Sequence, residues 1–281
     1  MPQLGAFARM WKRDSAAAIA AAMAAEGLAA AQWNFSAIGQ PTVSGDRTEE
    51  EYAGVRAAMA ASGLSVWGLS CTYNLLDADL SRRSGLNEAA VQMVSLAPAI
   101  GATAVTICTG SRASDGWTYH PDNQSAQAWQ EMRAGLDPLL AAAGRAGVVI
   151  GVEPEGGSVV SDATAGARLL DELGTDAPLG FILDAWNLLA GQPGRRDDEV
   201  LGEAFAVLGP RTVCLHAKDP LSRTFPSPRV DYEHVAELHA AHAPDAPVVM
   251  QDVTENDVGR TVSILQSAWG AVASRATEPR P

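Results

Sequence analysis

Four apolar runs in the sequence each end in a side chain that can bind a metal ion. The runs VVIGVE, GFILD, TVCLH and PVVMQ end at Glu153, Asp184, His216 and Gln251, with separations of 31, 32 and 35 residues. Two carboxylates, one imidazole and one amide oxygen suit Mn²⁺, Mg²⁺, Co²⁺ or Zn²⁺, and no thiolate joins them. The pattern predicts that these four residues hold one divalent metal ion.

The spacing carries more weight than any one of these residues, since a lone carboxylate or histidine after a strand is more often a loop residue or a helix cap. The register of the last run decides its ligand. If that strand ended one residue later, Asp252 would face inward in place of Gln251. We favour Gln251, because Val249 then shares its face while Met250 meets the helices.

Short apolar runs alternate with longer segments of helical periodicity along the whole chain, and this alternation predicts the fold. About 35 residues separate successive runs, as expected for a (β/α)8 TIM barrel, in which the carboxyl ends of the strands meet on one face. We expect a single α/β barrel domain over residues 1–275 and a frayed tail over 276–281. A doubly wound open sheet is the alternative, but the GxGxxG and GxxxxGK[ST] loops are absent. The predicted strands are Leu4–Arg9, Ala29–Phe35, Leu64–Cys71, Ala102–Thr109, Val148–Glu153, Gly180–Asp184, Thr212–His216 and Pro247–Gln251.

Helix ends can also be read from the sequence. Ser161 and Asp162 are candidate caps, and Gly147 and Gly174 follow helical segments where a left-handed residue is often needed. The clearest predicted helices are Thr48–Ala61, Asn87–Ile100, Gln124–Ala146, Asp162–Leu173, Tyr232–Ala241 and Asn256–Ala273.

Composition excludes several classes of protein. Hydrophobic residues make up 47% of the chain and charged residues 19%, which is enough for a large core, and the formal charge is −13. That charge would repel a nucleic-acid backbone. No signal peptide or membrane span is apparent. Cys71, Cys108 and Cys214 lie in apolar runs without metal-binding spacing, so we expect reduced core thiols and a cytoplasmic protein.

The strings GVEPEGG, FILDAWNLL, LHAKDP and VVMQDV resemble the sugar phosphate isomerase/epimerase family, the xylose isomerase-like barrels that include ketose 3-epimerases, inosose dehydratase and hydroxypyruvate isomerase. The resemblance spans nearly the whole chain. It implies that Glu153 is a metal ligand and the acid/base, and that Asp184 and His216 are ligands. It also implies a small-molecule carbohydrate substrate and is compatible with a homo-oligomer.

Two positions depart from the family pattern. The fourth ligand is usually a second glutamate that also serves as the opposing base, but here it is Gln251, which cannot accept a proton at neutral pH. The family's epimerases place a histidine where this chain has Asn187. A symmetric two-glutamate epimerase is therefore disfavoured.

Chemistry with one proton acceptor fits these departures. The resemblance implies a metal-dependent isomerase of a sugar or sugar derivative, in which Glu153 transfers the proton through a metal-stabilised enediolate. A lyase or dehydratase acting on a keto-sugar or inosose is the alternative, and a non-catalytic sugar-binding barrel is a third. The endonuclease branch with a trinuclear zinc site is disfavoured by a total of five histidines and the negative charge.

Further residues are expected to face the substrate. Lys218, two residues beyond His216, is a candidate catalytic residue, and a salt bridge from it to Glu155 or Asp219 is the competing interpretation. The segment Gly110–Asn123 is long enough to act as a lid. The predicted substrate-binding residues are Trp33, Asn34, Trp117, His120, Glu155, Trp186, Asn187 and Arg223, with Trp11, Cys71 and Tyr73 as further wall candidates. We expect His234, His239 and His242 to be solvated on a helix.

Overall fold

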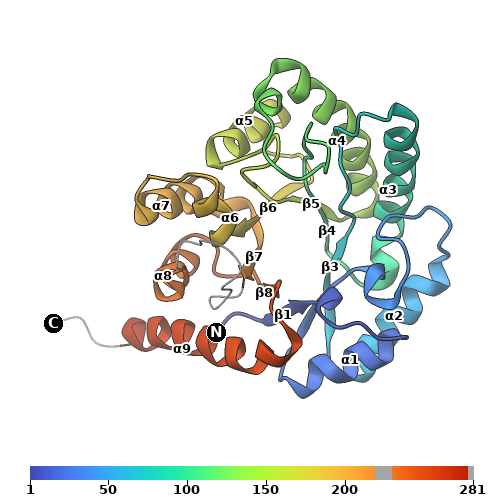
Figure 1. Cartoon of the computed structure of the whole chain (residues 1–281). Coiled ribbons are helices and arrows are strands. Elements are labelled where there is room, and N and C mark those ends of the chain that lie inside the picture. Colours follow the sequence, from blue (N-terminus) through green and yellow to red (C-terminus); the bar gives the residue numbers. More distant parts are fainter. Residues whose placement is uncertain (219–229, 278–281) are drawn as a thin grey trace.

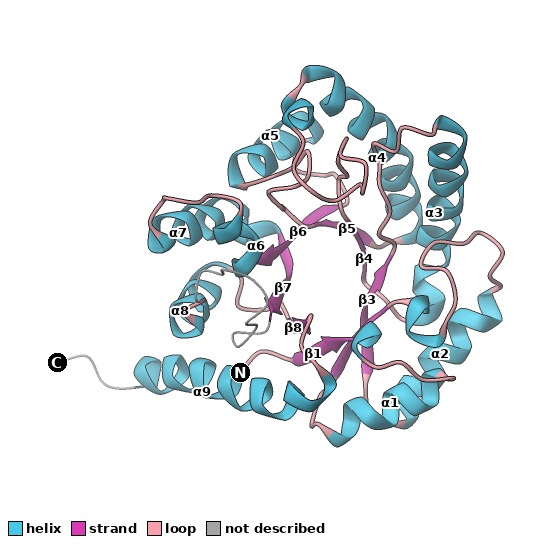
Figure 2. Cartoon of the chain, in the orientation of Figure 1, coloured by secondary structure: helices cyan, strands magenta, loops and turns pink. Residues whose placement is uncertain are grey.

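A computed structural model describes residues 1–218 and 230–277 of the chain. Its core is a closed barrel in which eight parallel strands pair in sequence order and the first also pairs with the last. Figure 2 shows this ring of strands surrounded by helices. The predicted (β/α)8 barrel is thereby confirmed. The strands are β1 (Leu4–Phe7), β2 (Ala30–Trp33), β3 (Ser65–Ser70), β4 (Ala104–Ile107), β5 (Val149–Val152), β6 (Leu179–Asp184), β7 (Thr212–Lys218) and β8 (Val248–Gln251).

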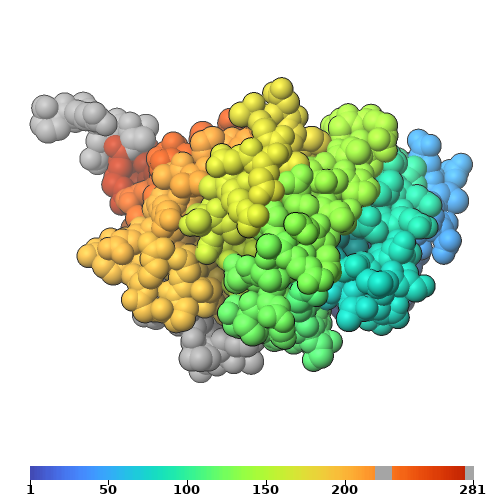
Figure 3. Space-filling view, turned by 90° about the horizontal axis from the view of Figure 1, so that it is seen from above, coloured from blue at the N-terminus to red at the C-terminus, as the bar shows by residue number. Residues whose placement is uncertain are grey.

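Helices follow the strands and form the outer layer, as Figure 1 shows. In the side view of Figure 3, the colours change in sequence order across the visible face, because each strand-helix unit packs beside the next. The α-helices are α1 (Ala16–Ala25), α2 (Glu49–Ala61), α3 (Leu80–Ile100), α4 (Ala126–Ala146), α5 (Ala163–Leu173), α6 (Ala185–Ala190), α7 (Asp197–Leu208), α8 (Tyr232–His242) and α9 (Val258–Thr277). Short 3-10 helices are η1 (Ala8–Met10), η2 (Phe35–Ile38), η3 (Pro121–Gln124), η4 (Gly209–Arg211) and η5 (Glu255–Asp257).

The ends of the helices agree with the sequence signals at several points. Asp162 caps α5 by accepting a hydrogen bond from the backbone N–H of Ala165, and Gly147 ends α4 in the left-handed conformation. Helix α3 begins well before the predicted residue 87, because Asp79 caps it at Leu80. Helix α9 runs to Thr277, so the tail predicted to begin at residue 276 starts inside a helix, and residues 278–281 lie outside the described part.

The interior of the barrel is filled at one level by small and large apolar side chains. This inner cluster consists of Ala30, Trp67, Ala104, Ile182, Cys214 and Val249. Met250 instead packs in the larger cluster between strands and helices. Val249 therefore points inward and Met250 outward, as the sequence predicted, and this alternation directs Gln251 toward the interior.

Two predictions about buried residues need correction. His239 is not solvated but buried, because its Nε2 lies 2.9 Å from the carbonyl oxygen of Ala246 and its Nδ1 accepts a hydrogen bond from Trp269. Cys71 and Cys214 are buried as expected, whereas Cys108 is only partly buried. Among the described residues, no helix is both long and apolar enough to span a membrane.

The close approach of β1 and β2 gives a stability prediction. A Cβ on Gly5 would lie 2.6 Å from the carbonyl oxygen of Ala30, which is backbone and cannot turn aside. Gly5→Ala should therefore lower the free energy of unfolding by about 1–3 kcal/mol, as overpacking does. Urea denaturation measures the loss.

Gly54 in α2 provides the matched control. A Cβ there meets no atom within 4 Å, so Gly54→Ala should raise stability by up to about 1 kcal/mol. Equal effects of the two substitutions would contradict the packing of β1 against β2.

Candidate active site

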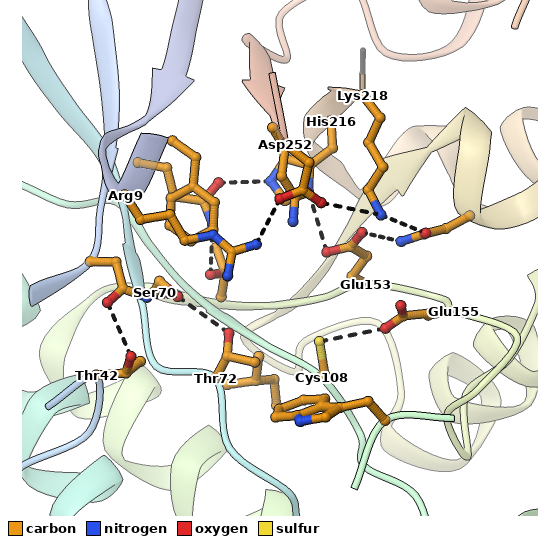
Figure 4. Close-up of a pocket in the computed structure, with 18 residues that line it drawn as sticks. Arg9, Thr42, Ser70, Thr72, Cys108, Glu153, Glu155, His216, Lys218 and Asp252 are labelled. Carbon is orange, nitrogen blue, oxygen red and sulfur yellow. Dashed lines mark hydrogen bonds and ion pairs between the residues drawn. The ribbon is translucent and has the colours of Figure 1, made fainter. Parts of the chain in front are cut away.

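A cavity of about 400 Å³ opens at the carboxyl ends of the strands. Figure 4 shows its side chains converging from separate strands and loops. The lining is polar and carries both signs of charge, which suits a hydroxylated ligand better than an apolar one. It comprises Phe7, Arg9, Gln32, Asn34, Thr42, Ser70, Thr72, Thr106, Ile107, Cys108, Trp117, Glu153, Glu155, Asn187, His216, Lys218, Gln251 and Asp252.

Three of the predicted metal ligands lie together at this cavity: Glu153 and His216 are part of its lining, and the wholly buried Asp184 lies beside them. Glu153 directly follows β5, Asp184 ends β6, and His216 lies on β7 level with Asp184. One ligand atom from each lies within 4.8 Å of the others, and all three residues are buried. The parallel barrel thus brings the ends of three consecutive strands into the range that one cation can bridge.

Buried acceptor atoms at this point have no hydrogen-bond partner among the described residues. They are Oδ2 of Asp184, Nδ1 of His216 and Oε1 of Gln251. Nδ1 of His216 lies 3.2 Å from Oε2 of Glu153 but does not form a well-directed hydrogen bond with it. Native proteins rarely leave such groups unpaired. Ligand atoms of Asp184 and His216 lie close enough to one of Glu153 for a single cation to bridge them, and Gln251 lines the same cavity, so the donor set fits a metal ion.

Gln251 and Asp252 both line the cavity, although successive strand residues normally face opposite ways. Asp252 has a left-handed backbone with a φ of 56°, which turns its side chain back toward the site. Its carboxylate is half-exposed and forms an ion pair of 3.0 Å with Arg9. Gln251 is buried with an unpaired oxygen, and its geometry therefore fits a ligand better than that of Asp252 does.

A chain of hydrogen bonds joins Lys218 to the carboxylates. Its Nζ donates to Oδ1 of Asn187 at 2.7 Å, and Nδ2 of Asn187 donates to Oε1 of Glu153 at 2.6 Å. Lys218 also lies 3.6 Å from Oδ2 of Asp184 and 4.0 Å from Oδ2 of Asp252. These carboxylates are its partners in the structure, whereas no ion pair with Glu155 forms and Asp219 lies outside the described residues.

Burial and neighbouring charges shift the pKa values of these groups. Burial raises the pKa of Asp184 to about 6, although the positive charge of Lys218 opposes the rise. Burial also acts to raise the pKa of Glu153, but His216, Lys218 and the hydrogen bond from Asn187 together lower it. For Lys218, burial is outweighed by the surrounding carboxylates, which raise its pKa. A bound cation would favour the ionised carboxylates further.

Glu155 and Cys108 lie next to each other in the lining of the cavity. Burial, followed by the charge of Glu153, raises the pKa of Glu155 to about 7. The Sγ of Cys108 lies 3.9 Å from Oε2 of Glu155, and burial and that carboxylate raise the pKa of the thiol well above its usual value. Cys108 therefore faces this cavity as a neutral thiol and is not the inert core residue that the sequence suggested.

The predicted substrate-binding residues divide into two groups. Asn34, Trp117, Glu155 and Asn187 line the cavity, and Trp117 is 43% exposed at its mouth. Others lie elsewhere, and Arg223 falls outside the described residues. The residues that do not line this cavity are Trp33, His120, Trp186, Trp11, Cys71 and Tyr73.

Local geometry explains why three of these residues lie outside the cavity lining. Gln32 and Asn34 face the cavity, so the alternation of β2 turns Trp33 outward, where it is wholly buried against Phe35. His120 caps η3 by accepting a hydrogen bond from the backbone N–H of Asp122. The ring of Trp186 lies under Lys218, with Nζ 4.8 Å from its centroid.

Several polar residues of the cavity were missed by sequence reasoning. Arg9, Thr72 and Thr106 are of common types and follow or occupy strands, and Thr42 lies in the loop between η2 and α2, all without a distinctive motif. Only the inward positions of the strands could have indicated them, and those depend on the exact register.

Comparisons with known proteins identify a family and a common fold. The sequence profile of the xylose isomerase-like TIM barrel family matches residues 7–248. No curated protein sequence matches the chain. Among solved structures, an L-ribulose 3-epimerase is similar over 100% of both chains, with 14% identity and a TM-score of 0.75.

Two further structures show the same fold. A 3-keto-D-glucoside 4-epimerase from E. coli covers 95% of this chain and 100% of its own, with 15% identity and a TM-score of 0.71. A D-psicose 3-epimerase from Clostridium cellulolyticum H10 covers 96% and 99%, with 12% identity and a TM-score of 0.70. At these identities the likeness shows the fold alone.

The pairing of Lys218 with the buried Asp184 gives a prediction. Lys218→Met leaves that carboxylate without its nearest cation, so the metal-free protein should lose stability on the order of 3 kcal/mol. Saturation with a divalent ion should reduce the loss, because the ion supplies the missing positive charge. Chemical denaturation with and without Mn²⁺ measures both values.

The exposed Lys12 is the control, and Lys12→Met should have little effect in either condition. If added metal leaves the stability loss of Lys218→Met unchanged, the metal ion does not supply the positive charge that Lys218 provides beside Asp184, and the prediction is wrong.

Proposed function

The chain belongs to the xylose isomerase-like TIM barrel family, and from this premise we propose that it is a metal-dependent isomerase of a sugar or sugar derivative. One observation carries the proposal. Buried acceptor atoms of Asp184, His216 and Gln251 have no hydrogen-bond partner among the described residues; ligand atoms of Asp184 and His216 lie within 4.8 Å of one of Glu153, and Gln251 lines the same polar cavity. Proteins bear the cost of such an arrangement where a cation completes it.

Glu153, Asp184, His216 and Gln251 would hold the ion, which is Mn²⁺, Mg²⁺, Co²⁺ or Zn²⁺ by the chemistry of the donors. When bound, the ion would polarise the carbonyl and hydroxyl oxygens of a sugar and so acidify the neighbouring C–H group. The two carboxylates balance its charge, since the amide of Gln251 adds none. A third carboxylate in that place would leave the centre anionic and a weaker Lewis acid.

Glu153 is the proposed acid/base. One of its oxygens accepts a hydrogen bond from Asn187, which fixes the orientation of the carboxylate. From that position Glu153 would take the proton from the carbon beside the carbonyl and return it to the former carbonyl carbon on the same face of the sugar, while the hydroxyl proton passes to the former carbonyl oxygen. Lys218 lines the same cavity and would donate a hydrogen bond to the oxygen on which negative charge develops.

The rest of the cavity would bind the substrate through fixed polar groups and one aromatic face. Asn34, Glu155 and Asn187 supply the polar groups, and Trp117 supplies the face at the mouth. The volume of about 400 Å³ is in the range of small-molecule sites, which supports a small carbohydrate. Similar solved structures are described as acting on L-ribulose and 3-keto-D-glucoside, which supports a keto-sugar.

A lyase acting on a keto-sugar is the second candidate. The observation in its favour is that the ammonium of Lys218 reaches the cavity beside the proposed metal centre. There it could protonate a leaving hydroxyl group while Glu153 removes the proton from the neighbouring carbon. The two functions share the site and differ in whether water is lost.

Metal binding is the first test. Metal-free protein should bind one equivalent of Mn²⁺ or Co²⁺, and an ion concentration a hundred times the Kd should stabilise it by about 2.7 kcal/mol. Asp184→Asn should abolish tight binding, because it removes a negative ligand. Titration calorimetry and thermal unfolding measure the two effects.

The exposed Glu88 gives the control, since Glu88→Gln should bind metal as the wild type does. A wild-type protein that binds no divalent ion would contradict the proposed function and would favour a non-catalytic sugar-binding barrel.

Proton transfer is the second test. Incubation of the metal-loaded enzyme with ketoses in D₂O should place solvent deuterium in the recovered sugars, as NMR and mass spectrometry would show. Glu153→Gln should lower the rate at least about 100-fold, since it removes the acid/base. Loss of water from the sugar would instead assign the lyase, and unchanged exchange in Glu153→Gln would exclude its proposed role.

A further inference from the structure

A buried amide on β2 contacts the proposed metal ligand from across the barrel. Gln32 is 2% exposed, and its Oε1 lies 2.7 Å from Nε2 of His216 on β7. Strands β1 and β8 separate β2 from β7 in the closed barrel, so this contact spans the interior. It engages the ring nitrogen of His216 that does not face Glu153.

The orientation of the amide is set at its other end. Nε2 of Gln32 donates to Oγ1 of Thr106 on β4 at 3.0 Å, and Thr106 is itself buried. An amide has one donor end and one acceptor end. In the structure Thr106 takes the donor end of this amide, and the acceptor oxygen faces His216.

A carbonyl oxygen can pair only with an N–H group, so this contact places a proton on Nε2 of His216. In a neutral imidazole, Nδ1 then carries the lone pair. Nδ1 is the atom that lies 3.2 Å from Oε2 of Glu153 and is buried without a hydrogen-bond partner. The ring is thus presented to the centre with the nitrogen that a metal ion requires.

We propose that Gln32, anchored by Thr106, is a positioning residue that selects the Nε2–H tautomer of His216 and aims Nδ1 at the metal ion. The choice of tautomer concerns this chain alone, whereas the role of Nδ1 toward a metal ion rests on the proposed function. A partner of this kind on a ligating histidine commonly changes metal affinity 10- to 100-fold when it is removed. No motif marks this role, because Gln32 lies in the plain run AAQW.

Three variants separate the acceptor role from space-filling. Gln32→Leu removes the acceptor and should weaken Co²⁺ binding about 10- to 100-fold. Gln32→Glu keeps an oxygen for the N–H of His216, and the hydroxyl of Thr106 can turn to donate to it, so affinity should be retained. Thr106→Val frees the amide to rotate and should weaken binding, whereas Thr103→Val, an exposed threonine just before β4, should not.

Binding is measured by calorimetry and by the absorption spectrum of bound Co²⁺, with thermal unfolding of each metal-free variant to check its fold. Weaker binding by Gln32→Leu together with recovery in Gln32→Glu supports the proposal. Equal binding by wild type and Gln32→Leu would overturn it, as would equal losses in Gln32→Leu and Gln32→Glu.

The tautomer is read without metal, by long-range ¹H–¹⁵N NMR of histidine-labelled protein in alkaline buffer, with His216→Asn to assign the signal. We expect Nε2 to carry the proton in the wild type and this preference to be lost in Gln32→Leu. An Nε2 without a proton in the wild type would overturn the inference even if metal binds. The expected tautomer in a protein that binds no metal would overturn the proposed function and leave the role of Gln32 toward His216 intact.

Discussion

The structure of the site depends on how two buried carboxylates are neutralised at the carboxyl end of a closed barrel. Asp184 is fully buried and Glu153 nearly so, and the parallel strands leave little water to solvate them. Burial of an unpaired carboxylate is costly, so positive charge must lie close by. Lys218 supplies part of it at 3.6 Å from Asp184, and a divalent ion among the unpaired acceptors would supply the rest. The polar cavity, the pKa shifts and the proposed chemistry all follow from this requirement.

The barrel could be predicted because strand and helix patterns repeat at a regular interval, and parallel strands must end on a common face. For the same reason the convergence of Glu153, Asp184 and His216 followed from their spacing alone. It was harder to predict which side chains face the cavity where this depends on the exact register of a strand. Trp33 was expected in the substrate wall, but the inward positions of β2 belong to Gln32 and Asn34. Alternation by single residues, which the sequence could not resolve there, decides such cases.

Interactions between distant parts of the chain were beyond sequence reasoning. The contact of Gln32 with His216 joins residues 184 positions apart, and no local motif announces it. Asp252 faces the cavity because its backbone adopts a left-handed conformation, where aspartate is tolerated but not required. His239 was expected on a solvated helix face and is instead held by Ala246 and Trp269. In each case tertiary contacts override what composition and periodicity indicate.

We propose that one cation binds where the ends of β5, β6, β7 and β8 meet. The sharpest test is an anomalous difference map from crystals grown with Zn²⁺, collected on both sides of the absorption edge. We expect a single strong peak about 2 Å from Nδ1 of His216 and from oxygens of Glu153, Asp184 and Gln251. A peak bound through Nε2 of His216, a peak held by Asp252 in place of Gln251, or no peak between these strands would contradict it.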